Sequence, residues 1–301
     1  MRRILIAACL SLLACPALAW NAAGHRLVAV IAWQQLSPTS RDVIADALAR
    51  HPDHRRWRER AGADEAMLVF AEASTWPDDI RNDPRFHDET RDAPTPALPG
   101  LSDTARHKAW HYVDYDRHGR VVDGELEHQL GRLTSVLRST GKIGEISNFL
   151  PWLIHLVADA HQPLHVGRHG DEGGNRFEIE NPFNPRLPFT NLHVYWDDLP
   201  GAPWLRGKRL TQRAARLLDA HSAPVQGTPS LWLKESHALL EKAYPDAAGS
   251  VLPIVDDAFH RRARDIADRR LVDAGYRLGR LLDSLFVRRV SRETPPSGQA
   301  D

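Results

Sequence analysis

The chain has 301 residues, and its 39 lysines and arginines balance its 39 aspartates and glutamates, so the formal charge is zero. This length can form one large domain with a substantial core. The lack of a basic excess argues against tight electrostatic binding of duplex nucleic acid, and no long block of like charge indicates an interaction tail.

The first 19 residues predict a secretory signal peptide, because a charged start is followed by an apolar run and by "ALA", an A-x-A cleavage site ending at Ala19. The segment is too short and wrongly flanked for a membrane span. Both cysteines, Cys9 and Cys15, lie within it, so the mature chain would lack disulfides. A lipoprotein site at Cys15 is the open alternative. We expect a soluble mature protein that begins at Trp20 and is secreted or periplasmic in a bacterium.

The mature chain has mostly helical periodicity. We expect helices over residues 23–36, 40–50, 63–76, 124–140, 145–162, 191–199, 205–221, 230–244 and 253–286. The segment 145–162 is apolar nearly all round, as in a buried central helix, and Pro151 would bend it or mark its first turn. Residues 166–190 are rich in Gly, Pro and Asn and predict a loop with a short hairpin around 175–180.

We therefore predict an all-α fold, a single-domain multi-helix bundle with a short β-hairpin or loop insertion near 166–190. The sequence has neither internal repeats nor a linker that would divide the chain. The domain would occupy residues 20–288, between the signal peptide 1–19 and a tail, 289–301, that we expect to be disordered.

Two predicted helices carry histidine–aspartate pairs. Positions four apart share a helix face, so His155 and Asp159 point at one site, and His193 and Asp197 repeat the arrangement. His165 follows the first pair, where "QPLH" turns the chain. One such pair is more often a surface or capping interaction. Two pairs with His165 indicate a zinc site, because His and Asp are ordinary zinc ligands and buried ionisable groups are costly unless paired or metal-bound.

Further motifs complete a pattern. "WNAAGH" begins at Trp20, "WPDDIR" contains Asp78 and Arg81, "HYVD" ends at Asp114 and "GGN" ends at Asn175. In this order, together with "HLVADAHQPLH" and "HVYWD", they resemble the zinc-dependent, single-strand-specific nucleases of fungi and plants (nuclease type I), which have bacterial relatives. His161 lies in the central motif without an assigned role.

The resemblance implies three zinc ions per chain in a cleft of the bundle. One ion would be held by Asp78, His111, His155 and Asp159; a second by His25, by the amine and carbonyl of Trp20 and by Asp159 as a bridge; the third by His165, His193 and Asp197. Only cleavage before Trp20 frees the amine that would bind zinc, so the signal peptide and the ligand set support each other.

The resemblance also implies the reaction. A zinc-activated hydroxide would hydrolyse single-stranded DNA and RNA to 5'-phosphorylated products, and would also remove the phosphate of 3'-nucleotides. Asp78, Asp159 and Arg81 would act in catalysis, since a guanidinium can hold phosphate through two hydrogen bonds.

Three residues would bind substrate. Tyr112 and Asp114 resemble the base site of the family, where stacking on an aromatic ring favours unstacked, single strands. Asn175 would either orient phosphate or serve only the turn.

Two other functions stay open. Zinc-dependent phospholipase C, of the same superfamily, shares the terminal tryptophan and the histidine–aspartate helix. It has a longer gap before the next histidine and uses Glu at the position of Asp197. A non-catalytic exported zinc-binding protein would need neither Arg81 nor Tyr112. We expect a monomeric zinc-dependent endonuclease and 3'-nucleotidase without a membrane partner.

Overall fold

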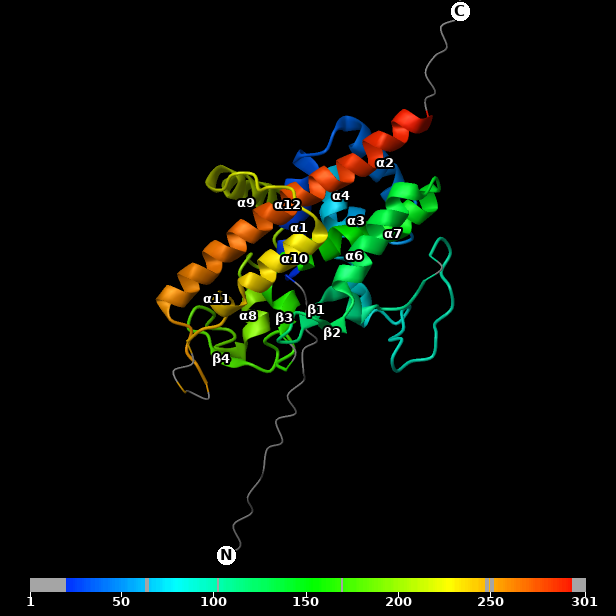
Figure 1. Cartoon of the computed structure of the whole chain (residues 1–301). Coiled ribbons are helices and arrows are strands. Elements are labelled where there is room, and N and C mark those ends of the chain that lie inside the picture. Colours follow the sequence, from blue (N-terminus) through cyan, green and yellow to red (C-terminus); the bar gives the residue numbers. More distant parts are fainter. Residues whose placement is uncertain are drawn as a thin grey trace, which may run out of the picture.

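The computed structural model describes residues 20–62, 65–101, 103–168, 170–246, 249 and 252–293. The predicted signal peptide 1–19 and residues 294–301 of the predicted tail lie outside these residues. Helices make up most of the described chain, and its few short strands gather at one end of the molecule beside α8 (Figure 1). The prediction of a mostly α-helical single domain is therefore confirmed.

The helices and strands have these bounds: α1 Ala22–Gln34, α2 Pro38–Ala49, α3 His54–Ala61, α4 Ala66–Ala73, α5 Trp76–Asp79, α6 Leu126–Ser139, α7 Ile143–Asp159, α8 Leu192–Asp198, α9 Gly207–Ala220, α10 Pro229–Ala238, α11 Leu240–Ala243 and α12 Asp257–Glu293, with β1 Val113–Tyr115, β2 Val121–Gly124, β3 Val166–Arg168, β4 Glu178–Glu180 and β5 Phe189–Asn191. Short 3₁₀ turns cover Ile80–Asn82, Lys108–His111 and Pro163–His165.

Asparagine side chains begin two helices that carry candidate ligands. Asn21 accepts hydrogen bonds from the backbone N–H groups of Ala23 and Gly24 at the start of α1. Asn191 accepts one from Val194 at the start of α8. Such caps satisfy backbone donors that have no partner within the helix. The two caps therefore fix where each helix starts, and so which side chains face inward.

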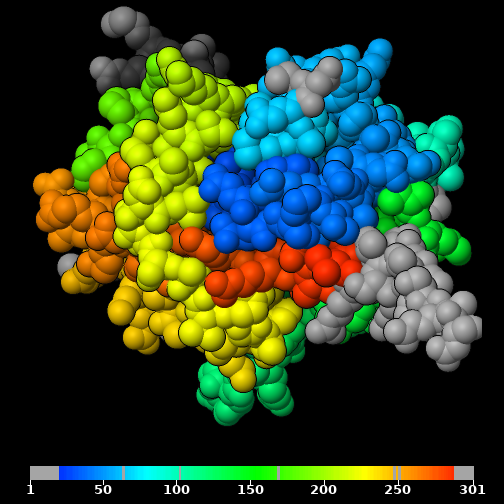
Figure 2. All heavy atoms as spheres, turned by 90° about the horizontal axis from the view of Figure 1, so that it is seen from above, coloured from blue at the N-terminus to red at the C-terminus, as the bar shows by residue number. Residues whose placement is uncertain are grey.

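The core is built around α1, α7 and α12. Figure 2 shows α12 in red beside the blue N-terminal helices, and α1 packs against it. The two backbones approach closely at Gly275, where a Cβ atom would lie 2.4 Å from Ile31 Cγ2. Pro151 lies inside α7 rather than in its first turn. Leu153, Ile154, Leu156 and Val157 of α7 are fully buried, as the apolar pattern predicted.

The three-stranded sheet joins two of the motifs. β1 pairs antiparallel with β2 and parallel with β3, so Val113 lies opposite Val166. This pairing sets "HYVD" beside "QPLH". β1 and β2 could not be predicted from the sequence, because strands of three or four residues give too little alternation to recognise. The short hairpin predicted around 175–180 is present but extends further, because β4 pairs with β5, which begins nine residues after β4 ends (189 − 180).

Several predicted helix boundaries differ from the structure. The sequence analysis missed α3, whose "HRRWRERA" buries only Trp57 and so has almost no apolar periodicity. The helix expected over 63–76 is α4 followed by a separate turn, α5, and Ala63 and Asp64 lie outside the described residues. The segment 230–244 forms two helices, α10 and α11.

The last helix, α12, starts at Asp257 and continues to Glu293, five residues beyond the predicted domain end at 288 (293 − 288). No helix among the described residues has both the length and the apolar character needed to cross a membrane.

Candidate metal centre

Segments far apart in the chain bring eight histidines and aspartates into three groups. The groups are His25, Asp78 and His155; His111, His155 and Asp159; and His165, His193 and Asp197. In each group the possible ligand atoms lie within 4.8 Å of one another. All of these side chains are buried except Asp78, which is intermediate. The structure therefore brings together all the His and Asp side chains that the sequence analysis named as ligands.

Asp159 lies between two histidines of α1 and α7. Its Oδ1 is 3.5 Å from His25 Nε2, and its Oδ2 is 3.3 Å from His155 Nε2. His111 Nδ1 is 3.1 Å from the same Oδ2. In a tetrahedral zinc site with bonds of about 2.1 Å, neighbouring ligand atoms lie about 3.4 Å apart. These separations suit zinc, and the two oxygens face different groups, as a bridging carboxylate requires.

The third group shows most directly that a cation fits. His165 Nδ1 lies 2.6 Å from the carbonyl of His111, and His193 Nδ1 lies 2.7 Å from that of Gly173. A carbonyl only accepts, so each Nδ1 carries the proton and each Nε2 has a bare lone pair. The two Nε2 atoms are 3.2 Å apart. Two lone pairs at this distance repel each other unless a cation lies between them, and Asp197 Oδ2, 3.7 Å from His193 Nε2, supplies a third donor.

Buried polar atoms without hydrogen bonds also indicate a metal site. Both ring nitrogens of His25 and Oδ1 of Asp159 are buried and, within the described residues, have no hydrogen-bond partner. A buried polar atom left in this state costs roughly 1–3 kcal/mol. His25 also stacks on His155 with ring centroids 3.8 Å apart. A metal ion would offset this cost, because it takes the lone pairs that nothing else accepts.

The pKa shifts of three histidines, His25, His111 and His165, favour the metal-binding form, whereas the carboxylates of Asp159 and Asp78 raise the pKa of His155 against its burial. Burial lowers the pKa of His25 well below its usual value, with His155 adding to the effect. Burial also lowers the pKa of His111 and His165, with Arg81 and His193 contributing respectively. At neutral pH these rings are uncharged and can donate lone pairs to a metal.

The carboxylates are shifted in the opposite direction. Burial raises the pKa of Asp159 to about 6, against the influence of His155. Burial raises the pKa of Asp197 well above its usual value, and Asp78 adds to the rise. A buried anion is disfavoured without a cation beside it, so a bound metal would stabilise both carboxylates.

Trp20 packs against the first turn of α1. Its side chain is fully buried and lies 6.5 Å, between ring centroids, from Trp196 of α8. Gly24 permits this position, since a Cβ there would lie 2.6 Å from Trp20 Cβ. The main chain of Trp20 is thereby held beside the helix that carries His25. Its role as a ligand stays a prediction.

A pocket of about 250 Å³ opens above the histidines and is lined by Arg81, His111, Tyr112, Asp114, His165, Asn175 and His193. Arg81 Nε lies 3.2 Å from Asp78 Oδ1. The structure thus places Arg81 and the three residues predicted to bind substrate, Tyr112, Asp114 and Asn175, on one pocket with His111, His165 and His193. Their individual roles stay predictions.

The two residues predicted to bind the base differ in exposure. Tyr112 is half-buried, and its hydroxyl bonds to Asp123. Burial and the Asp123 carboxylate raise the pKa of this hydroxyl, so it stays protonated. Asp114 is buried in β1, and a Cβ on Gly167 would lie 2.8 Å from its Oδ1. The glycine leaves room for the Asp114 carboxylate at the pocket wall.

Two residues left open by the sequence have clear structural partners. The side-chain amide of Asn175 donates to the carbonyl of Glu172, so one of its two N–H groups holds the turn, and the other N–H and the oxygen are left for substrate. His161 is buried away from the three groups, and its Nε2 accepts from Arg277 of α12. It therefore joins α7 to α12.

Several residues around the site were not predicted from the sequence. Lys108, Asp123 and Glu172 also line the pocket, and Gln162 donates to Asp197 Oδ1 at 2.8 Å. Gln162 stands within "HQPLH" and Lys108 three residues before His111, so closeness to the motifs was the available signal. Asp123 had none, because it reaches the pocket only through the β1–β2 pairing.

Comparison with known proteins shows where this arrangement occurs. The sequence profile described as S1/P1 Nuclease matches residues 20–287. The chain is 27% identical to Endonuclease 3 of Arabidopsis thaliana over 294 residues, which cover 90% of each chain. It is 25% identical to Nuclease S1 of Aspergillus oryzae over 185 residues, 59% of this chain and 53% of that protein. It is also 28% identical to Endonuclease 1 of Arabidopsis thaliana over 186 residues, 59% of this chain and 52% of that protein.

Proposed function

The chain belongs to the S1/P1 nuclease family and is a nuclease, and from this premise we propose that it is a zinc-dependent endonuclease that cuts single-stranded DNA and RNA to 5'-phosphorylated products and also acts as a 3'-nucleotidase. One observation carries the proposal: three groups of His and Asp side chains lie together, and His111, His165 and His193 from two of these groups line a single pocket whose wall also contains a guanidinium and an aromatic ring.

The eight clustered side chains and the main chain of Trp20 would hold three zinc ions. When bound, zinc supplies a Lewis acid that activates water near neutral pH and balances the negative charge of a phosphoryl group. Asp159 would keep two of the sites together, because its oxygens face different histidines. The carbonyls of Ser74, His111 and Gly173 hold the rings of His155, His165 and His193 in place through their Nδ1–H groups.

The substrate would be held by residues on the pocket wall. Arg81 is oriented by Asp78 and can donate two parallel hydrogen bonds to a phosphate. Tyr112 offers a ring on which an unpaired base can stack, and Asp114 can accept from the edge of that base. A base within a duplex is already stacked and paired, so it would have to leave the helix before reaching the ring. This requirement supports a preference for single strands.

We further propose that the protein is exported as a monomer and begins at Trp20 after removal of residues 1–19. The A-x-A sequence before Trp20 and the need for a free amine beside His25 both support this processing. The closest chemical competitor is zinc-dependent phospholipase C, which would use similar ligands on a different ester.

The decisive experiment compares substrates with one zinc-loaded preparation of the mature protein. Single-stranded DNA, RNA, duplex DNA, a 3'-mononucleotide and phosphatidylcholine are each incubated with and without chelator. We expect hydrolysis of both single strands and the 3'-nucleotide, abolished by chelator and restored by zinc. Release of phosphocholine without cleavage of nucleic acid would refute the nuclease proposal. Zinc binding without hydrolysis of any substrate would support a binding protein.

A further inference from the structure

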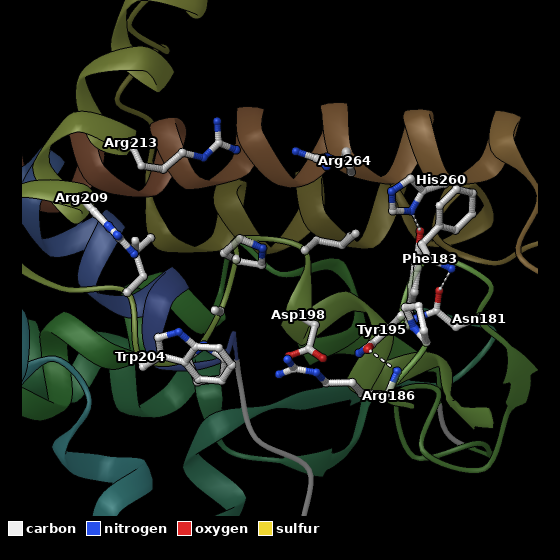
Figure 3. Close-up of a pocket in the computed structure, with 18 of the residues that line it drawn as sticks. Asn181, Phe183, Arg186, Tyr195, Asp198, Trp204, Arg209, Arg213, His260 and Arg264 are labelled. Atoms are coloured by element: carbon white, nitrogen blue, oxygen red, sulfur yellow. Dashed lines mark hydrogen bonds between the residues drawn. The ribbon is translucent and has the colours of Figure 1, made fainter. Parts of the chain in front are cut away.

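A second and larger hollow lies on the other side of α8 from the candidate metal centre. It has a volume of about 880 Å³ and is formed by the loops 181–186 and 199–205 together with α8, α9 and α12. Along α8, His193 and Asp197 face the metal groups, while Tyr195 and Asp198 line this hollow (Figure 3). We call it the arginine groove. It shares no lining residue with the pocket above the metal groups.

Five arginines line the arginine groove. Arg209, Arg213 and Arg216 stand on α9 at positions i, i+4 and i+7, so they form one row along a helix face. The row extends about 10 Å at 1.5 Å per residue. Arg264 comes from α12 and Arg186 from the loop before β5. Figure 3 shows Arg209, Arg213 and Arg264 along its helical wall.

Most of this positive charge has no ion-pair partner in the described part of the chain. Arg213 pairs with Asp268. Within the described residues, no ion pair or hydrogen bond involves the side chains of Arg186, Arg209, Arg216 or Arg264, and Asp198 is the acidic side chain of the lining. Since the whole chain has a formal charge of zero, four unpaired arginines around one hollow are a local concentration of charge. Their guanidinium groups suit phosphate.

Aromatic side chains lie among the arginines. Trp204 is 68% exposed and Phe183 is 40% exposed. Phe183 stacks on His260 with ring centroids 3.8 Å apart. An exposed tryptophan among arginines suits a ligand with both phosphates and flat rings. A lipid surface would match the charges, but the rings face a hollow rather than a protruding edge.

We propose that the arginine groove binds a stretch of single-stranded nucleic acid outside the cleft, with Arg209 and Arg216 contacting the phosphates and Trp204 stacking on a base. The identity of this ligand rests on the nuclease function, since a nuclease meets long strands. A dinucleotide bound in the cleft cannot occupy both sites at once. The groove therefore raises the affinity for long strands and leaves the hydrolysis of short ones unchanged.

The test measures binding and hydrolysis separately. A fluorescent, phosphorothioate-linked thymidine strand, which keeps its charges and resists cleavage, is titrated with the zinc-loaded protein over a range of salt concentrations. We expect Arg209→Gln/Arg216→Gln to weaken binding at low salt by roughly 2- to 30-fold. The slope of log K against log salt should fall by about 1.4, at ~0.7 per phosphate contact. Trp204→Ala should weaken binding by about 5-fold or more with little change in that slope.

Arg55→Gln/Arg138→Gln is the matched control. Both residues are exposed, on α3 and α6, and the double substitution removes the same total charge outside the groove. We expect the control to bind the strand like the wild type. All variants should hydrolyse a dinucleotide at the wild-type rate.

Four outcomes would overturn the proposal: unchanged strand binding in both groove variants, equal weakening in the control, an equal loss of dinucleotide hydrolysis, or loss of binding only to vesicles containing phosphatidylglycerol. If the protein hydrolyses no nucleic acid but the groove variants still lose strand affinity, the proposed function fails and the groove stands.

Discussion

Gly24→Ala tests whether the main chain of Trp20 binds metal. The added Cβ would lie 2.6 Å from Trp20 Cβ and 3.0 Å from Pro200 Cγ, whereas ordinary contact begins at 3.4 Å. Trp20 would therefore have to move by about 0.8 Å (3.4 − 2.6), because α1 is held by its buried face. Metal–ligand distances hold to about ±0.2 Å. A shift of this size is enough to break the bonds to the Trp20 amine and carbonyl.

In the metal-free protein, the stability effect of Gly24→Ala should be small, because two terms oppose each other. Alanine gains about 1 kcal/mol over glycine in a helix, while overpacking costs about 1–3 kcal/mol. The metal effect should be large. We expect elemental analysis to show about one zinc fewer than in the wild type, since His25 and Asp159 alone leave a site short of its usual ~4 ligands. Hydrolysis of single-stranded DNA should fall at least about 10-fold, as for disturbed metal surroundings.

Gly131→Ala is the matched control for Gly24→Ala. Gly131 is also helical, in α6, but a Cβ there meets nothing within 4 Å. This variant should keep its zinc and activity and melt at the same or a higher temperature, because only the helix propensity changes. Full zinc content and activity in well-folded Gly24→Ala would show that Trp20 is packing rather than ligand, and the reasoning would be wrong.

The other predictions concern the metal groups and the pocket. Asp159→Asn keeps the size of the side chain but removes the bridging charge, so hydrolysis should fall at least about 100-fold on every substrate, and an unchanged rate on any one of them would exclude a bridging role. Tyr112→Ala should cost roughly 1–3 kcal/mol, about 5- to 150-fold in kcat/KM, on nucleotides but much less on bis(p-nitrophenyl) phosphate. Tyr112→Phe should keep most activity. If Tyr112→Ala loses activity equally on the base-free ester, Tyr112 supports the metal groups instead. Chelation should lower the melting temperature by about 10 °C or more, since zinc present at ~1,000 times its Kd contributes about 4 kcal/mol at each site. If calorimetry shows no shift, the fold does not depend on metal. An additional residue before Trp20 should reduce both zinc content and hydrolysis, because it converts the amine to an amide. Intact-mass analysis of the exported protein should give a chain that begins at Trp20.

The sequence by itself determined the features that depend on local spacing. A helix repeats every 3.6 residues, so the pairs His155–Asp159 and His193–Asp197 had to share a face wherever their helices lay. The apolar pattern likewise identified α7 as buried, and the motif order led to the family. Every His and Asp named as a ligand lies in one of the three groups.

Tertiary structure decided the features that depend on distant segments. α3 lacks apolar periodicity, and β1 and β2 are too short to alternate visibly, so packing rather than local preference forms them. The orientation of the His165 and His193 rings comes from the carbonyls of His111 and Gly173, which no pattern along the chain reveals.

The arginine groove is the clearest example. The row on α9 could be read from the sequence, but Arg186, Trp204 and Arg264 belong to other segments. Whether an arginine is paired depends on which carboxylates the fold brings within about 4 Å, and sequence spacing fixes that distance only within a single helix or turn.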